Sequence, residues 1–117
     1  EMSASLVGSE MCIRDRFYVL VDNHFKEKKM VQDYADMLHR SPKTLSNLFT
    51  TCGLPSPLRI IHERIEAEAK RLLLYSQKSA KEITEILGFE DQATFSRFFK
   101  KMTGESVSEY RKREKRE

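Results

Sequence analysis

Two stretches of this chain share one pattern, Ser41-Pro-Lys-Thr-Leu-Ser-Asn-Leu-Phe49 and Asp91-Gln-Ala-Thr-Phe-Ser-Arg-Phe-Phe99. The second repeats the pattern of the first at an offset of 50 residues (91 − 41). Each begins with a residue that caps helices and then places apolar residues at positions i, i+3 and i+4. On the period of an α-helix these positions form one apolar stripe. The repeat therefore predicts two equivalent helices, each packed through one face.

The face opposite each stripe carries polar or cationic side chains of the kind that reads base edges. A helix of this type that follows a short helix and a tight turn forms a helix-turn-helix unit, whose second helix enters the major groove. The sequence therefore favours a protein that binds double-stranded DNA. The expected base contacts are Gln92, Ala93, Thr94, Ser96 and Arg97 in the second copy, and Lys43, Thr44, Ser46 and Asn47 in the first.

Side-chain chemistry indicates which DNA groups each copy is suited to contact. Arg97 suits guanine, Gln92 suits adenine, and Ala93 or Thr94 suits a thymine methyl group. The side chains of the first copy are shorter, so that half is expected to depend more on phosphates and DNA shape. The alternative is a solvated face held by pairs within the helix. Phosphate contacts are expected from cations at the edges of both units, namely Arg40, Lys81, Lys100 and Lys101.

The rest of the chain is helical in pattern, which predicts an all-α domain of seven helices. Caps, prolines and glycines place the helices at about 17–28, 31–38, 42–52, 57–75, 80–87, 92–102 and 107–113. The first helix-turn-helix unit spans residues 17–55 and the second spans residues 77–117. Residues 56–76 form a long linker helix, which is expected to act as a rigid connector.

One family resemblance rests on the segment Ile83-Thr-Glu-Ile-Leu-Gly-Phe-Glu-Asp-Gln-Ala-Thr-Phe-Ser-Arg-Phe-Phe-Lys-Lys-Met-Thr-Gly104 and the following Tyr110-Arg111. These residues resemble the signature of AraC/XylS-type transcription regulators, and residues 17–113 agree with that pattern. The resemblance implies two helix-turn-helix units, an absent N-terminal sensor or dimerisation domain, contact with RNA polymerase, and activation of transcription. Thr84 and Val107 depart from the pattern, which usually has Ala and Pro there.

The N-terminal 16 residues show no helical period. Leu6–Arg16 resembles an in-frame translation of a transposon-based sequencing adapter. We therefore expect residues 1–16 to be a non-native tail, with residues 17–117 as the DNA-binding domain and Cys12 without a function. The alternative is an ordinary disordered tail.

Composition excludes several other functions. The net charge of +3 is mild, and no apolar run is long enough to span a membrane. Two distant cysteines do not suggest a disulfide framework, so a protein of the reducing cytoplasm is expected. Two cysteines and three scattered histidines form no metal, cofactor or nucleophilic site, so an enzyme is not expected.

Glutamates of the linker helix are expected to pair with neighbouring cations, and three C-terminal cations are expected to be solvated. These residues are Glu63, Glu66, Glu68, Arg64, Lys70 and Arg71, and then Arg111, Lys112 and Arg113.

Two rival interpretations remain open at this point. A helical protein-interaction module can share the same architecture without binding DNA. The chain can also be the output domain of a membrane-bound sensor hybrid, which only the upstream gene sequence distinguishes. Salt dependence separates DNA binding from an apolar protein contact.

Overall fold

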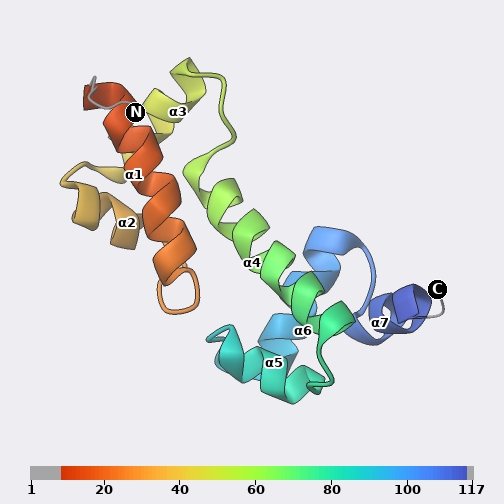
Figure 1. Cartoon of the computed structure of the whole chain (residues 1–117). Coiled ribbons are helices and arrows are strands. Elements are labelled where there is room, and N and C mark those ends of the chain that lie inside the picture. Colours follow the sequence, from red (N-terminus) through yellow and green to blue (C-terminus); the bar gives the residue numbers. More distant parts are fainter. Residues whose placement is uncertain (1–8, 116–117) are drawn as a thin grey trace. The chain divides into compact units, whose positions relative to one another are not determined.

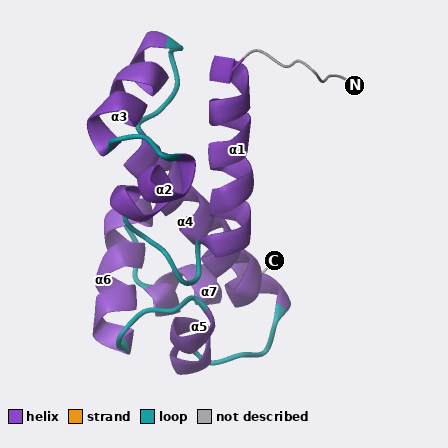
Figure 2. Cartoon of the chain, turned by 90° about the vertical axis from the view of Figure 1, so that its left-hand side faces the viewer, coloured by secondary structure: helices purple, strands orange, loops and turns teal. Residues whose placement is uncertain are grey.

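The computed structural model describes the backbone of residues 9–115 and the side chains of residues 13–113. Within this range the chain consists of helices and connecting turns, with no strand, so the all-α prediction is confirmed (Figure 2). The helices are α1 (Ser9–His24), α2 (Val31–Leu38), α3 (Pro42–Thr51), α4 (Pro57–Tyr75), α5 (Ala80–Ile86), α6 (Gln92–Thr103) and α7 (Val107–Lys115) (Figure 1).

The chain divides into two compact units, residues 1–64 and residues 65–117. Described parts of the first unit are α1, α2, α3 and the beginning of α4. The second unit comprises the remainder of α4 with α5, α6 and α7. Each unit therefore contains one copy of the repeat and its own core.

In the first unit the apolar stripe of α3 packs into an aromatic core. Leu45 and Phe49 are fully buried, as the repeat predicts. The ring of Phe17 in α1 lies 5.1 Å from the ring of Phe49 and 5.6 Å from that of Tyr34 in α2, both in edge-to-face arrangements. Such pairs add to the free energy gained by burying apolar surface. The core thereby fixes which face of α3 points outward.

The second unit repeats this arrangement with α6. Phe95 and Phe99 are fully buried, and their ring centroids lie 6.1 Å apart. The ring of Phe89 lies 5.4 Å from that of Phe95, and the ring of Tyr110 lies 5.4 Å from that of Phe99. These aromatic residues form the core of the unit. Thr84 is also buried, and its hydroxyl donates to the Ala80 carbonyl oxygen at 2.8 Å, which satisfies the polar group.

The helix boundaries follow the predicted caps closely, and α2 and α4 have the predicted limits. Ser41 caps α3, Asp91 caps α6, and Ser79 forms a capping box with Glu82 at the start of α5. Small differences occur at C-terminal ends. Helix α5 ends at Ile86 and α7 extends to Lys115.

The first helix differs from its prediction. It begins at Ser9 instead of residue 17. It ends at His24 instead of residue 28, and residues 25–27 form a turn outside the helix. The physical reason is that Ile13 precedes Phe17, Val21 and Phe25 at a spacing of four residues and is only 7% exposed. The apolar stripe of α1 therefore extends into the segment expected to lack a helical period. The part of that prediction concerning residues 1–8 lies outside the described residues, as does the side chain of Cys12.

The linker helix α4 pairs its charges largely as predicted. Glu66 pairs with Lys70, and Glu68 pairs with Arg71. Glu63 pairs with Arg59 instead of a later cation. Arg64 also has a partner outside α4. Its Nε donates to Asp22 of α1 at 2.6 Å, and its guanidinium lies 4.3 Å from the centroid of the Phe25 ring.

Candidate DNA-binding surface

Helix α6 buries one face and exposes the other. Because Phe95 and Phe99 are buried, side chains on the opposite side face solvent. Gln92, Ala93 and Arg97 are exposed, as predicted for base contacts. Thr94 and Ser96 are half-buried and therefore offer less surface than predicted. The structure thus brings one amide and one guanidinium to the open face of this helix.

Helix α3 has the same construction. With Leu45 and Phe49 buried, all four predicted base-contacting residues are exposed, namely Lys43, Thr44, Ser46 and Asn47. The structure thus presents in both copies the polar face that the repeat predicts.

Both helices begin with the same cap. The Ser41 hydroxyl accepts from the Thr44 backbone N–H at 3.1 Å, and the Asp91 carboxylate accepts from the Thr94 backbone N–H at 2.8 Å. The hydroxyls of Thr44 and Thr94 also bond to these cap side chains. Each threonine therefore supports the start of its helix. This capping role competes with the contact to a base that the sequence predicts for each threonine.

The turns before the two helices differ in length and in backbone chemistry. In the first unit His39 adopts a left-handed conformation with φ of 59° and Ser41 follows it by two positions. In the second unit Gly88 adopts φ of 81° and Asp91 follows it by three positions. Glycine has no Cβ and adopts this region at low cost, whereas histidine is strained there.

The predicted phosphate contacts are all exposed, on different elements of the two units. Arg40 follows the C-terminus of α2, and its Nη1 donates to the His39 carbonyl oxygen at 3.2 Å. Lys81 lies in the first turn of α5, whose capping box already uses the N–H groups of Ser79 and Glu82. Lys100 and Lys101 lie in the last turn of α6. The exposure of all four cations leaves them accessible to the phosphates of a DNA backbone.

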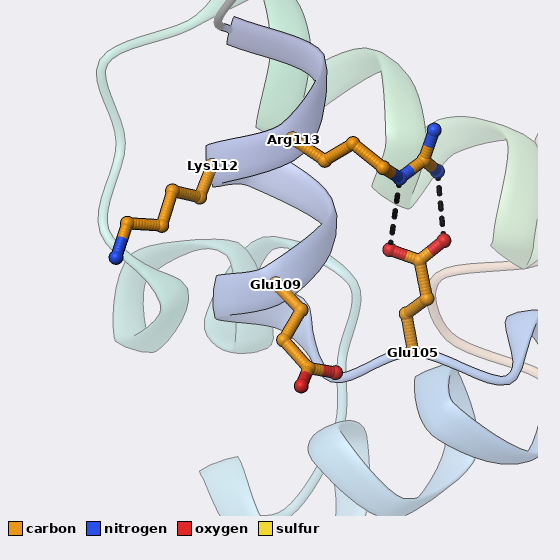
Figure 3. Close-up of a pocket in the computed structure, with 4 residues that line it drawn as sticks. All are labelled: Glu105, Glu109, Lys112 and Arg113. Carbon is orange, nitrogen blue, oxygen red and sulfur yellow. Dashed lines mark hydrogen bonds and ion pairs between the residues drawn. The ribbon is translucent and has the colours of Figure 1, made fainter.

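Of the three cations of α7 that are predicted to be solvated, Lys112 and Arg113 are exposed, and the prediction is wrong for Arg111. Arg111 is half-buried and donates to the carbonyl oxygens of Leu73 at 3.0 Å and Lys78 at 2.7 Å. Arg113 forms a two-point ion pair with Glu105, with donor–acceptor distances of 2.7 and 3.2 Å (Figure 3). Lys112 is exposed, as predicted, and points away from that pair.

Glu105, Glu109, Lys112 and Arg113 line a shallow pocket beside α7 (Figure 3). Its carboxylates are already used, because Glu105 binds Arg113 and Glu109 accepts from the Ser106 backbone N–H at 3.0 Å. The two carboxylates of this pocket stand beside two cations, Lys112 and Arg113, so its formal charge is zero. The bond between Ser106 and Glu109 belongs to the capping box that the sequence predicts at the start of α7, whereas the pair between Glu105 and Arg113 depends on how the chain turns before α7.

No group of three or more His, Cys, Asp or Glu side chains within the described residues is arranged to hold a metal ion. None of the helices described is long and apolar enough to cross a membrane.

The geometry agrees with the relatives of this chain. A family model described as a helix-turn-helix domain matches residues 34–113, a range that includes both α3 and α6. This chain belongs to the AraC-type family of helix-turn-helix transcription regulators. The AraC/XylS resemblance is thus confirmed, and with it the class of DNA-binding transcription regulators.

Particular AraC-type proteins resemble this chain over most of its length. The raffinose operon transcriptional regulatory protein RafR of Pediococcus pentosaceus is 34% identical over 82 residues, which cover 70% of this chain and 30% of RafR. The C-terminal domain of AraT, a response regulator from Geobacillus stearothermophilus, has a TM-score of 0.76 at 28% identity, covering 92% of this chain and 88% of that one.

The same fold occurs in the DNA-binding domain of AdpA, whose crystal structure contains a target DNA. That chain has a TM-score of 0.71 at 23% identity, and the match covers 83% of this chain and 87% of AdpA's domain. This chain spans about a third of the length of the curated relatives that it matches.

Proposed function

We propose that this AraC-type domain binds a specific double-stranded DNA sequence, with α3 and α6 in successive major grooves, and that it activates transcription. The observation that carries the proposal is the shared construction of the two helices. Each is capped at its N-terminus, buries an aromatic or aliphatic stripe, and exposes a polar face. Recognition helices present their N-terminal half to base edges in this way.

The exposed side chains differ between the two helices in what they can recognise. The planar guanidinium of Arg97 suits the two acceptors on a guanine edge, and the amide of Gln92 suits adenine. The α3 face carries Lys43 and Asn47 at its exposed positions. Its shorter polar side chains are suited to reading DNA shape and backbone as well as bases.

The continuity of α4 supports a two-site mode of binding. This helix runs without interruption from Pro57 to Tyr75 and contributes to both units. In the proposed complex it holds the two recognition helices about 34 Å apart, which is one turn of DNA. A site of two half-sites with this spacing is therefore expected.

A binding-site selection on random duplexes, followed by fluorescence anisotropy on the selected and scrambled sequences, tests the proposal. Selection should return two short motifs about one helical turn apart. Binding should weaken steeply with salt because phosphate contacts release counterions. A protein-interaction module would instead select no motif, and its apolar contacts would be nearly insensitive to salt.

The wider regulator is also part of the proposal. Since relatives are about three times as long as the matched region, we propose that a sensor or dimerisation domain belongs to the full protein. We further propose that the bound protein contacts RNA polymerase in the cytoplasm. A reporter gene placed behind the selected site, transcribed with and without the full-length protein, distinguishes activation from repression.

A further inference from the structure

The two recognition helices begin with opposite charges. Arg40 and Ser41 stand at the start of α3, whereas Glu90 and Asp91 occupy the same two positions before α6. The formal charge is therefore +1 at the first entrance and −2 at the second, and all four residues are exposed. The N-terminus of a helix carries a partial positive charge that attracts phosphate. Helix α3 keeps this attraction, whereas the carboxylates of α6 oppose it.

The negative charge of Asp91 is not needed to cap α6. Ser41 caps α3 by accepting the equivalent N–H bond from Thr44 with a neutral hydroxyl. Asp91 uses its Oδ1 for the N–H of Thr94 at 2.8 Å. An ionised carboxylate has two oxygens with about four acceptor positions, so the cap leaves acceptor capacity at the tip of the helix.

Asp91 is ionised at neutral pH. The hydrogen bond from the Thr94 backbone lowers the pKa of the Asp91 carboxyl, and the Thr94 hydroxyl and the positive charge of Arg97 lower it further. The charges of Asp91 and Arg97 therefore interact on α6. At the equivalent positions of α3 stand Ser41 and Asn47, which carry no charge.

On the basis of the DNA binding proposed above, we propose that Asp91 is a specificity-determining residue of the second unit. Its carboxylate accepts a hydrogen bond from the amino group of a cytosine in the major groove, and it repels phosphate wherever no such group faces it. A carboxylate has no favourable contact with the DNA backbone, whereas a cytosine amino group offers a matching donor. Asp91 thus penalises incorrect sequences more than the correct one.

Asp91→Asn tests this proposal because asparagine caps a helix as well as aspartate but carries no charge. Binding-site selection with this variant should lose a preference for cytosine at one position of the α6 half-site. Affinity for a scrambled duplex should rise about two- to fivefold at low salt. Affinity for the selected duplex should not rise. Circular dichroism melting checks that the variant folds.

Two substitutions at the equivalent position of α3 serve as matched variants. Ser41→Asn retains the cap without changing the charge and should alter neither the selected motif nor the scrambled-duplex affinity. Ser41→Asp places a carboxylate at the entrance of α3 and should weaken scrambled-duplex binding about two- to fivefold.

The outcomes distinguish this proposal from the function on which it rests. If Asp91→Asn tightens both duplexes equally and keeps the cytosine preference, the charge opposes all DNA alike and the specificity proposal is overturned. The proposed function survives that result, provided that the unchanged protein still prefers its selected duplex. If the unchanged protein shows no such preference, sequence-specific binding fails and this inference fails with it.

Discussion

The Nε of Arg111 in α7 donates to the main-chain carbonyl oxygen of Leu73 in α4 at 3.0 Å, across 38 residues of sequence. Its Nη2 also donates to the carbonyl oxygens of Ser76 and Lys78, at 3.4 and 2.7 Å. The last carbonyls of a helix have no partner within the helix. One guanidinium therefore satisfies the C-terminal end of α4 and the loop that follows it, and attaches α7 to both.

We expect Arg111→Met to destabilise the second unit by about 1–3 kcal/mol, because partly buried carbonyl oxygens lose a charged donor. Urea unfolding followed by circular dichroism measures the change. Lys112→Met is the matched control, since Lys112 is exposed, and it should be nearly neutral. Equal effects of the two substitutions would contradict a structural role for Arg111.

We expect Ile13→Ala to lower the free energy of unfolding by about 1–3 kcal/mol, because Ile13 is 7% exposed and extends the apolar stripe of α1. Arg16→Ala on the exposed side of the same helix should change stability by less than about 0.5 kcal/mol. Thermal melting compares the two variants. If Ile13→Ala is silent, the segment before Phe17 contributes nothing to the fold.

Gly88→Val should destabilise the second unit by about 1–3 kcal/mol, because a β-branched residue is strained at φ of 81°. The converse change, His39→Gly, relieves strain at φ of 59° and should leave stability unchanged or raise it by up to about 1 kcal/mol. Thermal melts of both variants test the pair. An unchanged melt for Gly88→Val would show that the turn tolerates another backbone conformation.

The stability of the first unit should fall at high pH through Tyr34. Burial raises the pKa of Tyr34 to about 12, with smaller contributions from the negative charges of Asp33 and Glu27. Because the folded pKa lies above the ordinary value of 10.0, this stability is present below pH 10 and is lost as the pH rises towards 12. Tyr34→Phe should remove this component of the pH dependence.

The comparison is made by urea unfolding at several pH values between 8 and about 12. At neutral pH the variant should itself be less stable, since the Tyr34 hydroxyl donates to the Lys28 carbonyl oxygen at 2.6 Å. Lysines and the remaining tyrosines lose protons in both proteins in this pH range. The contribution of Tyr34 is therefore the difference between the two curves of unfolding free energy against pH. Parallel curves would show that Tyr34 ionises as readily in the folded state as in the unfolded one.

Arg97 and Lys101 should affect DNA binding in different ways. Arg97→Ala should cost about 1–3 kcal/mol on the selected duplex and relax the preference at one base position. Lys101 lies one turn later on α6, so Lys101→Ala should weaken all sequences similarly and lower the salt slope by about one.

Fluorescence anisotropy on selected and scrambled duplexes at several salt concentrations separates the two roles. If Arg97→Ala loses affinity equally on both duplexes, Arg97 contacts phosphate instead of a base. If neither substitution matters, α6 is not a recognition helix.

Local sequence pattern was sufficient to predict the N-terminal caps of α3, α5 and α6 and the faces that α3 and α6 bury, although it placed the start of α1 too late. Ser41, Ser79 and Asp91 cap their helices where local pattern predicts, and Leu45 and Phe95 are buried as the repeat predicts. These features depend on residues within one or two turns of each other, so periodicity and capping rules reach them. The exposed polar faces of α3 and α6 are predicted by the same local pattern, because they lie opposite the apolar stripes.

The partners of Arg64, Arg111 and Arg113 depend on how the helices pack, unlike those of Lys70 and Arg71, which pair within one turn of α4 as predicted. Arg64 reaches Asp22 across 42 residues, and Arg111 reaches Leu73 across 38. Arg113 reaches back over a turn to Glu105. A flexible charged side chain has many possible partners in the sequence, and the packing of helices selects among them because it brings one carboxylate or carbonyl within hydrogen-bond distance. Local sequence pattern therefore does not predict these partners.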